Sequence, residues 1–283
     1  MNKEILPIVV LYKKHLPEAD SINSILDGDI QGLISDIYVY DNTPRGQENA
    51  LPENGCYRGR NVIYVQDPAN SGVSIAYNSG LKKAAELGYK YVLILDQDTY
   101  FPSESLSVYK KAVEDFPNIN LYVPSLITKK GEFCSPLKYA LHRGFVIGQL
   151  DPGIYSLDTY SPINSGMLLN VGVALSCGGY NNNVYLDFSD FQFIERLKKV
   201  SSNFYLIPLS LQQDLSNEDE NHQNLLIRYA IYCDCARRCH RESLSDDFIY
   251  FMMVLVRGLK LVTRTKRIEF LNVFYKKYVR GKK

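Results

Sequence analysis

Four short apolar runs constrain the fold of this chain more than any other feature of its sequence. They cover residues 5–12, 36–41, 62–66 and 91–96, and they are rich in the β-branched and aromatic residues that favour strands. Residues 73–88 lie between the last two runs and place apolar side chains at helical spacing. Strands that alternate with a helix predict an α/β domain built on a largely parallel sheet.

The pattern beyond residue 100 is looser. Residues 122–127 and 204–209 are further strand candidates, and residues 188–200 fit a helix. Residues 132–162 contain Gly and Pro often enough to predict mostly loop or hairpin. From residue 221 onward the sequence is amphipathic and predicts helices.

Composition excludes several classes of protein. Of the 283 residues, 46% are hydrophobic and 12% aromatic, which is too much apolar surface for a disordered chain. No stretch approaches the roughly 20 apolar residues of a membrane span, and we expect no secretory signal peptide. Cys233, Cys235 and Cys239 form a C-x-C-x3-C cluster, but zinc sites use C-x2-4-C spacing, so we expect reduced structural thiols and keep a metal site as the alternative.

Carboxylates follow two of the predicted strands at the edge where an α/β sheet binds ligands. Asp41 ends one strand, and Asp96 and Asp98 follow another in the sequence LDQDT. An acid at the mouth of an apolar strand is poorly solvated unless a positive group meets it. A divalent cation that carries a phosphorylated ligand would meet it, since hard oxygen ligands suit Mg²⁺ or Mn²⁺. Turn or helix-capping aspartates are an equally good explanation of D-x-D alone.

The order and spacing of six sequence blocks resemble the family 2 glycosyltransferases, which have the GT-A fold. The resemblance covers most of the chain, and the LDQDT form of the acidic motif is most similar to the bacterial rhamnosyltransferase branch. The blocks are VVLY (9–12), VYDNT (39–43), NSGVSIAYNSG (70–80), YVLILDQDT (91–99), INSGMLL (163–169) and GGYNNNVYLDFSDFQFIERL (178–197).

The resemblance implies a nucleotide-binding role for several residues. Tyr12 would cover the nucleobase, for which an aromatic face is suited, and Asp41 would accept a hydrogen bond from the imide N–H of uracil or thymine. Gly72 and Asn78 would bring backbone and amide groups close to the nucleotide, and Asp96 would approach the ribose. A core tyrosine at Tyr12 and a simple turn at Asp41 are the structural alternatives.

The resemblance also implies the catalytic groups. Asp98 would ligate Mg²⁺ or Mn²⁺ on the donor diphosphate, and Arg228 would contact the diphosphate, although a solvated surface arginine is the alternative. Asp190 stands six residues before Arg196, as the family's catalytic base does, and would take the proton of the acceptor hydroxyl. An acid at a helix N-terminus also suits the helix dipole. Asp187 is a candidate acceptor or sugar-hydroxyl contact.

The sequence departs from the family pattern at four positions. Tyr77 stands where many relatives carry Arg or Gln, and Gln192 stands where relatives often have an acid. Ser189 replaces the Glu that commonly precedes the base. Gln213 occupies the expected position of a histidine that assists the metal or diphosphate, with Asp214 beside it. Metal coordination would therefore be sparser than usual, or Asp214 would substitute.

The near-zero net charge of +1 hides a strong asymmetry. Residues 257–283 contain ten Lys or Arg and one acid, a net +9, so the preceding 256 residues carry −8. The apolar run FIYFMMVLV at 248–256 comes just before this basic tail, which suits a helix lying on an anionic membrane surface. A packing helix with a solvated basic face and a nucleic-acid patch are the alternatives, but the acidic remainder argues against nucleic acid.

We therefore expect a GT-A-like domain over residues 1–220, with a mostly parallel sheet flanked by helices, and a basic helical extension over residues 221–283. The expected activity is inverting transfer of a sugar, L-rhamnose from dTDP-rhamnose, to a lipid-linked saccharide in bacterial surface polysaccharide synthesis. The enzyme would work in the cytoplasm at the inner face of the plasma membrane. A UDP-hexose donor, a non-catalytic nucleotide-sugar or glycan-binding module, and a nucleotidyltransferase are the alternatives; the last lacks its Gly-rich loop after the first strand.

Overall fold

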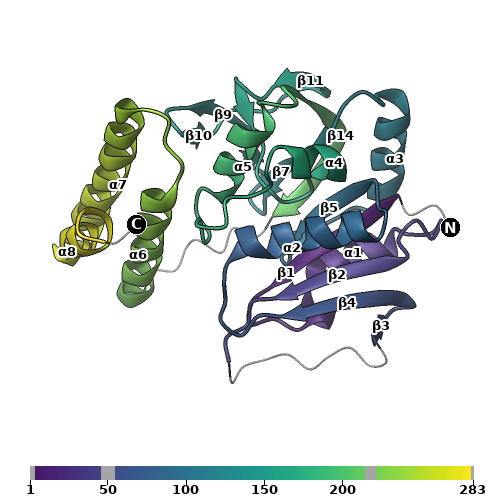
Figure 1. The fold of residues 1–283 in the computed structure, drawn as a ribbon, viewed down its shortest axis with the longest axis horizontal. Coiled ribbons are helices and arrows are strands. Elements are labelled where there is room, and N and C mark those ends of the chain that lie inside the picture. The colour runs from purple at the N-terminus through teal and green to yellow at the C-terminus, as the bar shows by residue number, and fades with distance from the viewer. Residues whose placement is uncertain (1–3, 46–54, 214–220, 282–283) are drawn as a thin grey trace.

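A mixed sheet, mostly parallel, forms the centre of the computed structural model, which describes residues 4–45, 55–213 and 221–281 (Figure 1). Its described strands, in spatial order, are β11 (Gly153–Ser156), β14 (Asn203–Gln213), β7 (Leu121–Thr128), β13 (Leu168–Asn170), β5 (Tyr91–Asp96), β1 (Ile5–Leu11), β2 (Asp36–Asp41), β4 (Arg60–Gln66) and β3 (Cys56–Tyr57). Two short strands, β6 (Thr99–Tyr100) and β8 (Phe133–Ser135), pair with β14 and β7.

The predicted parallel arrangement is confirmed for the four strands β5, β1, β2 and β4, which are hydrogen-bonded neighbours in that order. β14 also runs parallel to β7. Strand β13 is inserted antiparallel between β5 and β7, an exception to the parallel pattern. The stretch predicted as loop or hairpin contains a small second sheet of β9 (Leu137–Ala140), β10 (Arg143–Phe145) and β12 (Tyr160–Ser161).

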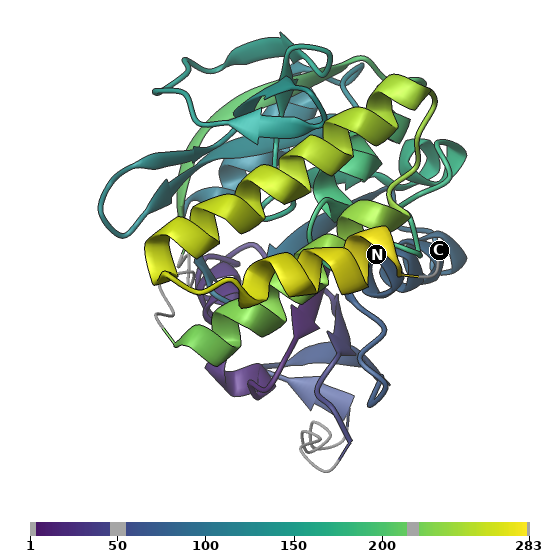
Figure 2. The same ribbon diagram turned by 90° about the vertical axis from the view of Figure 1, so that its left-hand side faces the viewer.

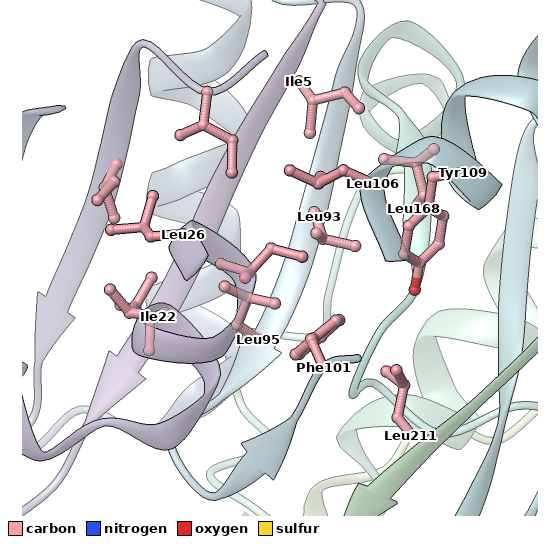
Figure 3. Close-up of a cluster of buried hydrophobic side chains, with 14 of the residues drawn as sticks. Ile5, Ile22, Leu26, Leu93, Leu95, Phe101, Leu106, Tyr109, Leu168 and Leu211 are labelled. Carbon is pink, nitrogen blue, oxygen red and sulfur yellow. The ribbon is translucent and has the colours of Figure 1, made fainter. Parts of the chain in front are cut away.

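Helices cover both faces of the central sheet. Helices α1 (Asp20–Asp27) and α3 (Ser105–Asp115) pack on one face, where Ile22, Leu106 and Tyr109 meet Leu93 and Leu95 of β5 (Figure 3). Helices α2 (Val73–Glu86), α4 (Val171–Ser176) and α5 (Ser189–Leu197) pack on the other face. Both faces of the central strands are therefore buried, which explains why their sequences are continuously apolar.

The C-terminal helices form a third packed cluster beside the edge of this domain. They are α6 (His222–Arg238), α7 (Leu244–Thr265), α8 (Glu269–Val273) and the π-helical segment Phe274–Val279. Helix α7 crosses this side of the molecule next to α8 (Figure 2). The Tyr229 hydroxyl of α6 donates to the Val254 carbonyl of α7 at 2.8 Å, and it fills the space beside Gly258, where a Cβ atom would lie 2.3 Å from it. No helix of the described ranges has the length and apolarity needed to cross a membrane.

The cysteine cluster lies inside this helical group. Cys233, Cys235 and Cys239 are buried, and the Cys239 thiol donates to the Cys235 carbonyl. Burial raises the pKa of Cys235 to about 11 and that of Cys233 to about 12, so both thiols stay protonated at neutral pH. Within the part of the chain that the structure describes, no group of three or more His, Cys, Asp or Glu side chains is arranged to hold a metal ion.

Candidate active site

Three neighbouring strands deliver the predicted site residues to one edge of the sheet. Strands β5, β1 and β2 are parallel neighbours, so their carboxyl ends lie together. Tyr12 follows β1, Asn42 follows β2, and Gln97 follows β5. The Tyr12 amide donates to Oε1 of Gln97 at 3.0 Å, which fixes the end of β1 against the D-x-D segment.

A cavity of about 450 Å³ opens at this edge. The other walls come from α2, the loop before α5, the end of β14, and α6. The lining residues are Val10, Tyr12, Asn42, Asn70, Gly72, Val73, Tyr77, Asp96, Gln97, Asp98, Tyr185, Leu186, Gln213, Arg228 and Ile231. Five of the nine residues predicted from the sequence line this cavity: Tyr12, Gly72, Asp96, Asp98 and Arg228.

The two acids of the D-x-D segment have different partners. Oδ1 of Asp96 accepts a hydrogen bond of 3.0 Å from the Tyr77 hydroxyl, and Oδ1 of Asp98 accepts one of 2.9 Å from Nε2 of Gln213. Burial, and then the charge of Asp98, raise the pKa of Asp96 to about 7. A cation bound between the two carboxylates would relieve both effects.

Asp190 lies in the first turn of α5, where its charge acts on Asp96 and Tyr77. The preceding Phe188 has φ +68°, and this left-handed turn starts the helix. Oδ1 of Asp190 accepts a 2.8 Å hydrogen bond from the Phe191 amide, while burial raises the pKa of Asp190 to about 6. The charge of Asp190 also raises the pKa of Asp96 and of Tyr77. The structure therefore brings Asp190 and Asp96 into one electrostatic cluster, although Asp190 is not among the lining residues of the cavity.

Asp187 and Arg228 were predicted to contact different substrates, but they bind each other. Both guanidinium Nη atoms of Arg228 donate to the two carboxylate oxygens of Asp187, with an Nη2–Oδ1 distance of 2.9 Å. Arg228 lines the cavity, whereas Asp187 faces a second cavity on the other side of the loop. The pair ties α6 to the segment that carries Asp190.

Residues 12–154, just over half of the chain, match the family model described as glycosyl transferase family 2. The chain belongs to glycosyltransferase family 2. The matched segment contains the three strand ends and the D-x-D segment described above. No curated protein matches this glycosyltransferase in sequence.

Solved structures of other glycosyltransferases share its fold. The crystal structure of S. aureus TarS 1-349 matches with a TM-score of 0.56 and 14% identity, covering 96% of this chain and 72% of that one. The same TarS segment in complex with UDP matches at 0.55 and 15% identity, covering 88% and 70%. GalNAc-T7 with UDP, GalNAc and Mn²⁺ matches at 0.56 and 10% identity, covering 81% and 47%. The GT-A-like fold predicted from the sequence is confirmed.

In this family 2 glycosyltransferase, Asp41 is fully buried behind the cavity. Its carboxylate accepts hydrogen bonds from the Tyr64 hydroxyl and, at 2.9 Å, from the Thr43 amide. The next residue, Asn42, does line the cavity, and its buried Oδ1 has no hydrogen-bond partner in the described structure. Sequence reasoning missed Asn42, although its position directly after Asp41 in a strand-end motif was a signal.

Gly72 and Asn78 both hold the loop that precedes α5. Gly72 has φ +96°, and a Cβ atom there would lie 2.3 Å from the Tyr185 carbonyl, so only glycine fits. Asn78 lies outside the cavity lining, and its amide is bonded at 2.8 Å to both the carbonyl and the amide of Tyr180. Tyr185, which lines the cavity, was not singled out from the sequence.

The contacts of Gln192 explain why this chain has an amide where relatives often have an acid. It is buried, its Oε1 accepts from the His240 amide at 2.6 Å, and its Nε2 donates to Oε2 of Glu195 at 2.6 Å. An acid at this position would lack the donor for Glu195 and place two carboxylates together. Gln192 faces the C-terminal helices and does not line the 450 Å³ cavity.

The residues at the end of β5 suit a divalent cation. Asp98 and Asp96 offer hard carboxylate oxygens at the cavity wall. Gln213, in place of the family's histidine, donates from its Nε2 to Asp98 and accepts at its Oε1 from the Thr99 hydroxyl. Asp214, the possible substitute for that histidine, lies outside the described residues. Two carboxylates at this edge have the chemistry that suits Mg²⁺ or Mn²⁺.

Proposed function

We propose that this glycosyltransferase inverts the anomeric centre of a nucleotide-sugar donor as it transfers the sugar. The observation that carries the proposal is the position of Asp190 in the first turn of α5, where its charge acts on Asp96 at the end of β5. A raised pKa near 6 leaves Asp190 ionised at neutral pH and still basic enough to accept a proton.

Asp190 is the proposed general base. It takes the proton of an acceptor hydroxyl while that oxygen forms a bond to the anomeric carbon. The bond between the anomeric carbon and the donor's diphosphate oxygen breaks on the opposite face, and the nucleoside diphosphate leaves with the electron pair. Asp190 thus ends the step protonated, and the configuration at the anomeric carbon is inverted.

Asp98 would hold Mg²⁺ or Mn²⁺, with Asp96 directed to the ribose and Arg228 to the diphosphate. The cation supplies charge neutralisation for the leaving diphosphate when it is bound. Tyr77 keeps Asp96 oriented through its hydroxyl, and Gln213 does the same for Asp98.

Tyr12 and Asn42 form the proposed base subsite, backed by Asp41. The Tyr12 side chain is 43% exposed at the cavity wall, where a ring can cover a nucleobase. The buried Oδ1 of Asn42 has no partner in the described structure and would accept the imide N–H of uracil or thymine once the side chain turns toward the cavity, and Asp41 holds the turn that carries it. We propose dTDP-L-rhamnose as the donor, on the resemblance to rhamnosyltransferases.

A UDP-hexose is the second candidate donor. The solved structures that share the fold include complexes described with UDP and with UDP-GlcNAc. Either nucleotide presents the same imide edge to Asn42, so the base subsite serves both candidates.

The proposed acceptor is a lipid-linked saccharide at an anionic membrane surface, on the cytoplasmic side of a bacterial plasma membrane. Helix α7 supports this proposal with a stripe of exposed apolar side chains at helical spacing: Leu244, Phe248, Met252, Val256 and Leu259. The opposite face of α7 buries Tyr250 and Val254 against α6, so the helix is both packed and amphipathic.

A panel of nucleotide sugars tests the proposal. The panel holds dTDP-rhamnose, UDP-glucose, UDP-GlcNAc and UDP-galactose, each with Mn²⁺ or EDTA, and the readout is release of the nucleoside diphosphate. Metal-dependent release from one donor is expected. Binding of a nucleotide sugar with no turnover of any donor would instead indicate a binding module.

A further inference from the structure

A second cavity, of about 410 Å³, lies on the other side of the loop that leads into α5, the helix that carries Asp190. We call it the basic pocket. Arg143 of β10 and Arg257 and Lys260 of α7 line it, together with Tyr232 of α6 and Asp187. The pocket therefore lies between the small sheet, the loop before α5 and the helices α6 and α7.

The basic pocket carries uncompensated positive charge. The structure contains no carboxylate within ion-pair distance of Arg143, Arg257 or Lys260 among the residues it describes. Asp187, the acid in the lining, is already neutralised by its two-point pair with Arg228. The guanidinium of Arg257 lies 4.0 Å from the centroid of the Tyr232 ring, which holds it over the pocket floor.

The residues that line the basic pocket include the sequence neighbours of Asp190, the predicted base. Asp187, Phe188 and Phe191 line it, and Asp190 lies among them in sequence. Tyr185 and Leu186, immediately before, line the donor cavity. A molecule in the basic pocket is thus next to the segment that would deprotonate the acceptor, on the side away from the donor nucleotide.

We propose that the basic pocket binds a phosphate group carried by the acceptor, so that this enzyme glycosylates a phosphorylated substrate. This inference rests on the proposed function, because only a sugar transfer requires an acceptor substrate. Two guanidinium groups, an ammonium and a phenol hydroxyl offer more donors than one carboxylate accepts, whereas the three terminal oxygens of a phosphate can use them. Phe188, Phe191 and Val256 add an apolar border that suits the carbon skeleton next to such a phosphate.

Calorimetric titration of the full chain with octyl phosphate, in EDTA, tests the pocket. The double variant R143Q/R257Q and the milder K260Q remove charge at exposed positions, and R264Q removes a charge from α7 outside the pocket lining. We expect octyl phosphate to bind about tenfold or more weakly to R143Q/R257Q, less weakly to K260Q, and unchanged to R264Q. Equal affinity of the double variant and the unaltered chain would overturn the proposal.

Two further arms separate the alternatives. Titration of the same proteins with UDP or dTDP and Mn²⁺ should give equal affinities, and a chain that binds octyl phosphate but no nucleotide would refute the proposed function while the basic pocket stands. Sedimentation with phosphatidylglycerol vesicles tests for a lipid headgroup as the source of phosphate. If R143Q/R257Q loses vesicle binding but keeps octyl phosphate binding, the arginines serve the membrane and the acceptor proposal is overturned.

Discussion

Arg228 and Asp187 form a two-point ion pair across 41 residues of sequence, between α6 and the loop before α5. The side chain of Asp187 is 14% exposed and that of Arg228 is 37% exposed. The arginine therefore has two tasks, because its guanidinium compensates a largely buried carboxylate and also lines the donor cavity.

We expect R228M to lower the free energy of unfolding by about 1–2 kcal/mol, because it leaves Asp187 unpaired. The double variant D187N/R228M should recover part of this loss, since the buried charge is gone. Thermal melts of the two single variants and the double variant measure the coupling. A double variant as unstable as R228M would contradict this assignment. Nucleotide affinity should fall in R228M and in the double variant alike.

Replacement of Asp190 by Asn should abolish transfer and leave nucleotide binding intact. Loss of a general base costs about 10²–10⁴-fold in rate. The control D158N removes an exposed acid of a surface ion pair and should keep full activity. In the unaltered enzyme, kcat/KM should fall below about pH 6, where Asp190 becomes protonated. Turnover of D190N at the level of D158N would rule out the base role.

Removal of the Tyr77 hydroxyl should shift the pH dependence of donor binding. The hydrogen bond from Tyr77 lowers the pKa of Asp96, so Y77F should raise that pKa further above about 7, by as much as about one pH unit. When the pH is lowered, Asp96 of Y77F would become protonated earlier, so affinity for UDP or dTDP with Mn²⁺ would be lost at a higher pH than in the unaltered chain. Y109F is the matched control, because Tyr109 is equally buried and bonds a backbone carbonyl. Coincident pH profiles for Y77F and Y109F would refute the prediction.

His142 should make stability depend on pH. Its Nδ1 lies 2.7 Å from Oε1 of Glu195 and its Nε2 lies 3.1 Å from Oδ1 of Asp246, so these carboxylates raise its pKa above the usual 6.5. The added stability is fully present below pH 6.5 and is lost as pH rises through the raised pKa. We expect H142Q to melt about 2–4 °C below the unaltered chain at pH 6, a gap that closes at alkaline pH. A gap that widens with pH would contradict the ion-pair assignment.

The exposed stripe of α7 should decide membrane association. The side chains of Phe248, Met252 and Leu259 are 65%, 38% and 44% exposed, so their replacement by Ser leaves the core intact. The triple variant should bind phosphatidylglycerol vesicles at least about tenfold more weakly, because each apolar side chain buried in the interface contributes roughly 1 kcal/mol or more. The control I30S/V200S changes exposed apolar residues elsewhere. Equal sedimentation of both variants would exclude α7 as the contact.

Local sequence pattern was sufficient for the strands that carry the site, because β1, β2 and β5 are buried on both faces and must be apolar throughout. It did not single out α1 or α3, although the buried Ile22, Ile25 and Leu26 of α1 have helical spacing, because eight and eleven residues give a short periodic pattern. The antiparallel insertion of β13 could not be predicted either, since strand direction depends on tertiary neighbours and leaves no local signal.

The site was predictable where polar side chains stand at the ends of apolar strands. Asp96 and Asp98 reach the cavity because Asp96 is the last residue of β5 and Asp98 lies two residues beyond it. Asp41 and Asn42 show the limit: which of two adjacent side chains faces the cavity depends on where the pleat of β2 ends. The pairing of Asp187 with Arg228 joins segments far apart in sequence, so only the folded chain shows it.

The alternation along residues 185–191 has a consequence for how such an enzyme can change. Tyr185 and Leu186 line one cavity, and Asp187, Phe188 and Phe191 line the other. On α6, Ile231 and Tyr232 divide between the cavities in the same way, so the loop and α6 together form the partition. Under the proposed function, donor and acceptor would lie on opposite sides of this partition. Substitutions on α7 would then alter the acceptor side without changing the loop residues that line the other cavity.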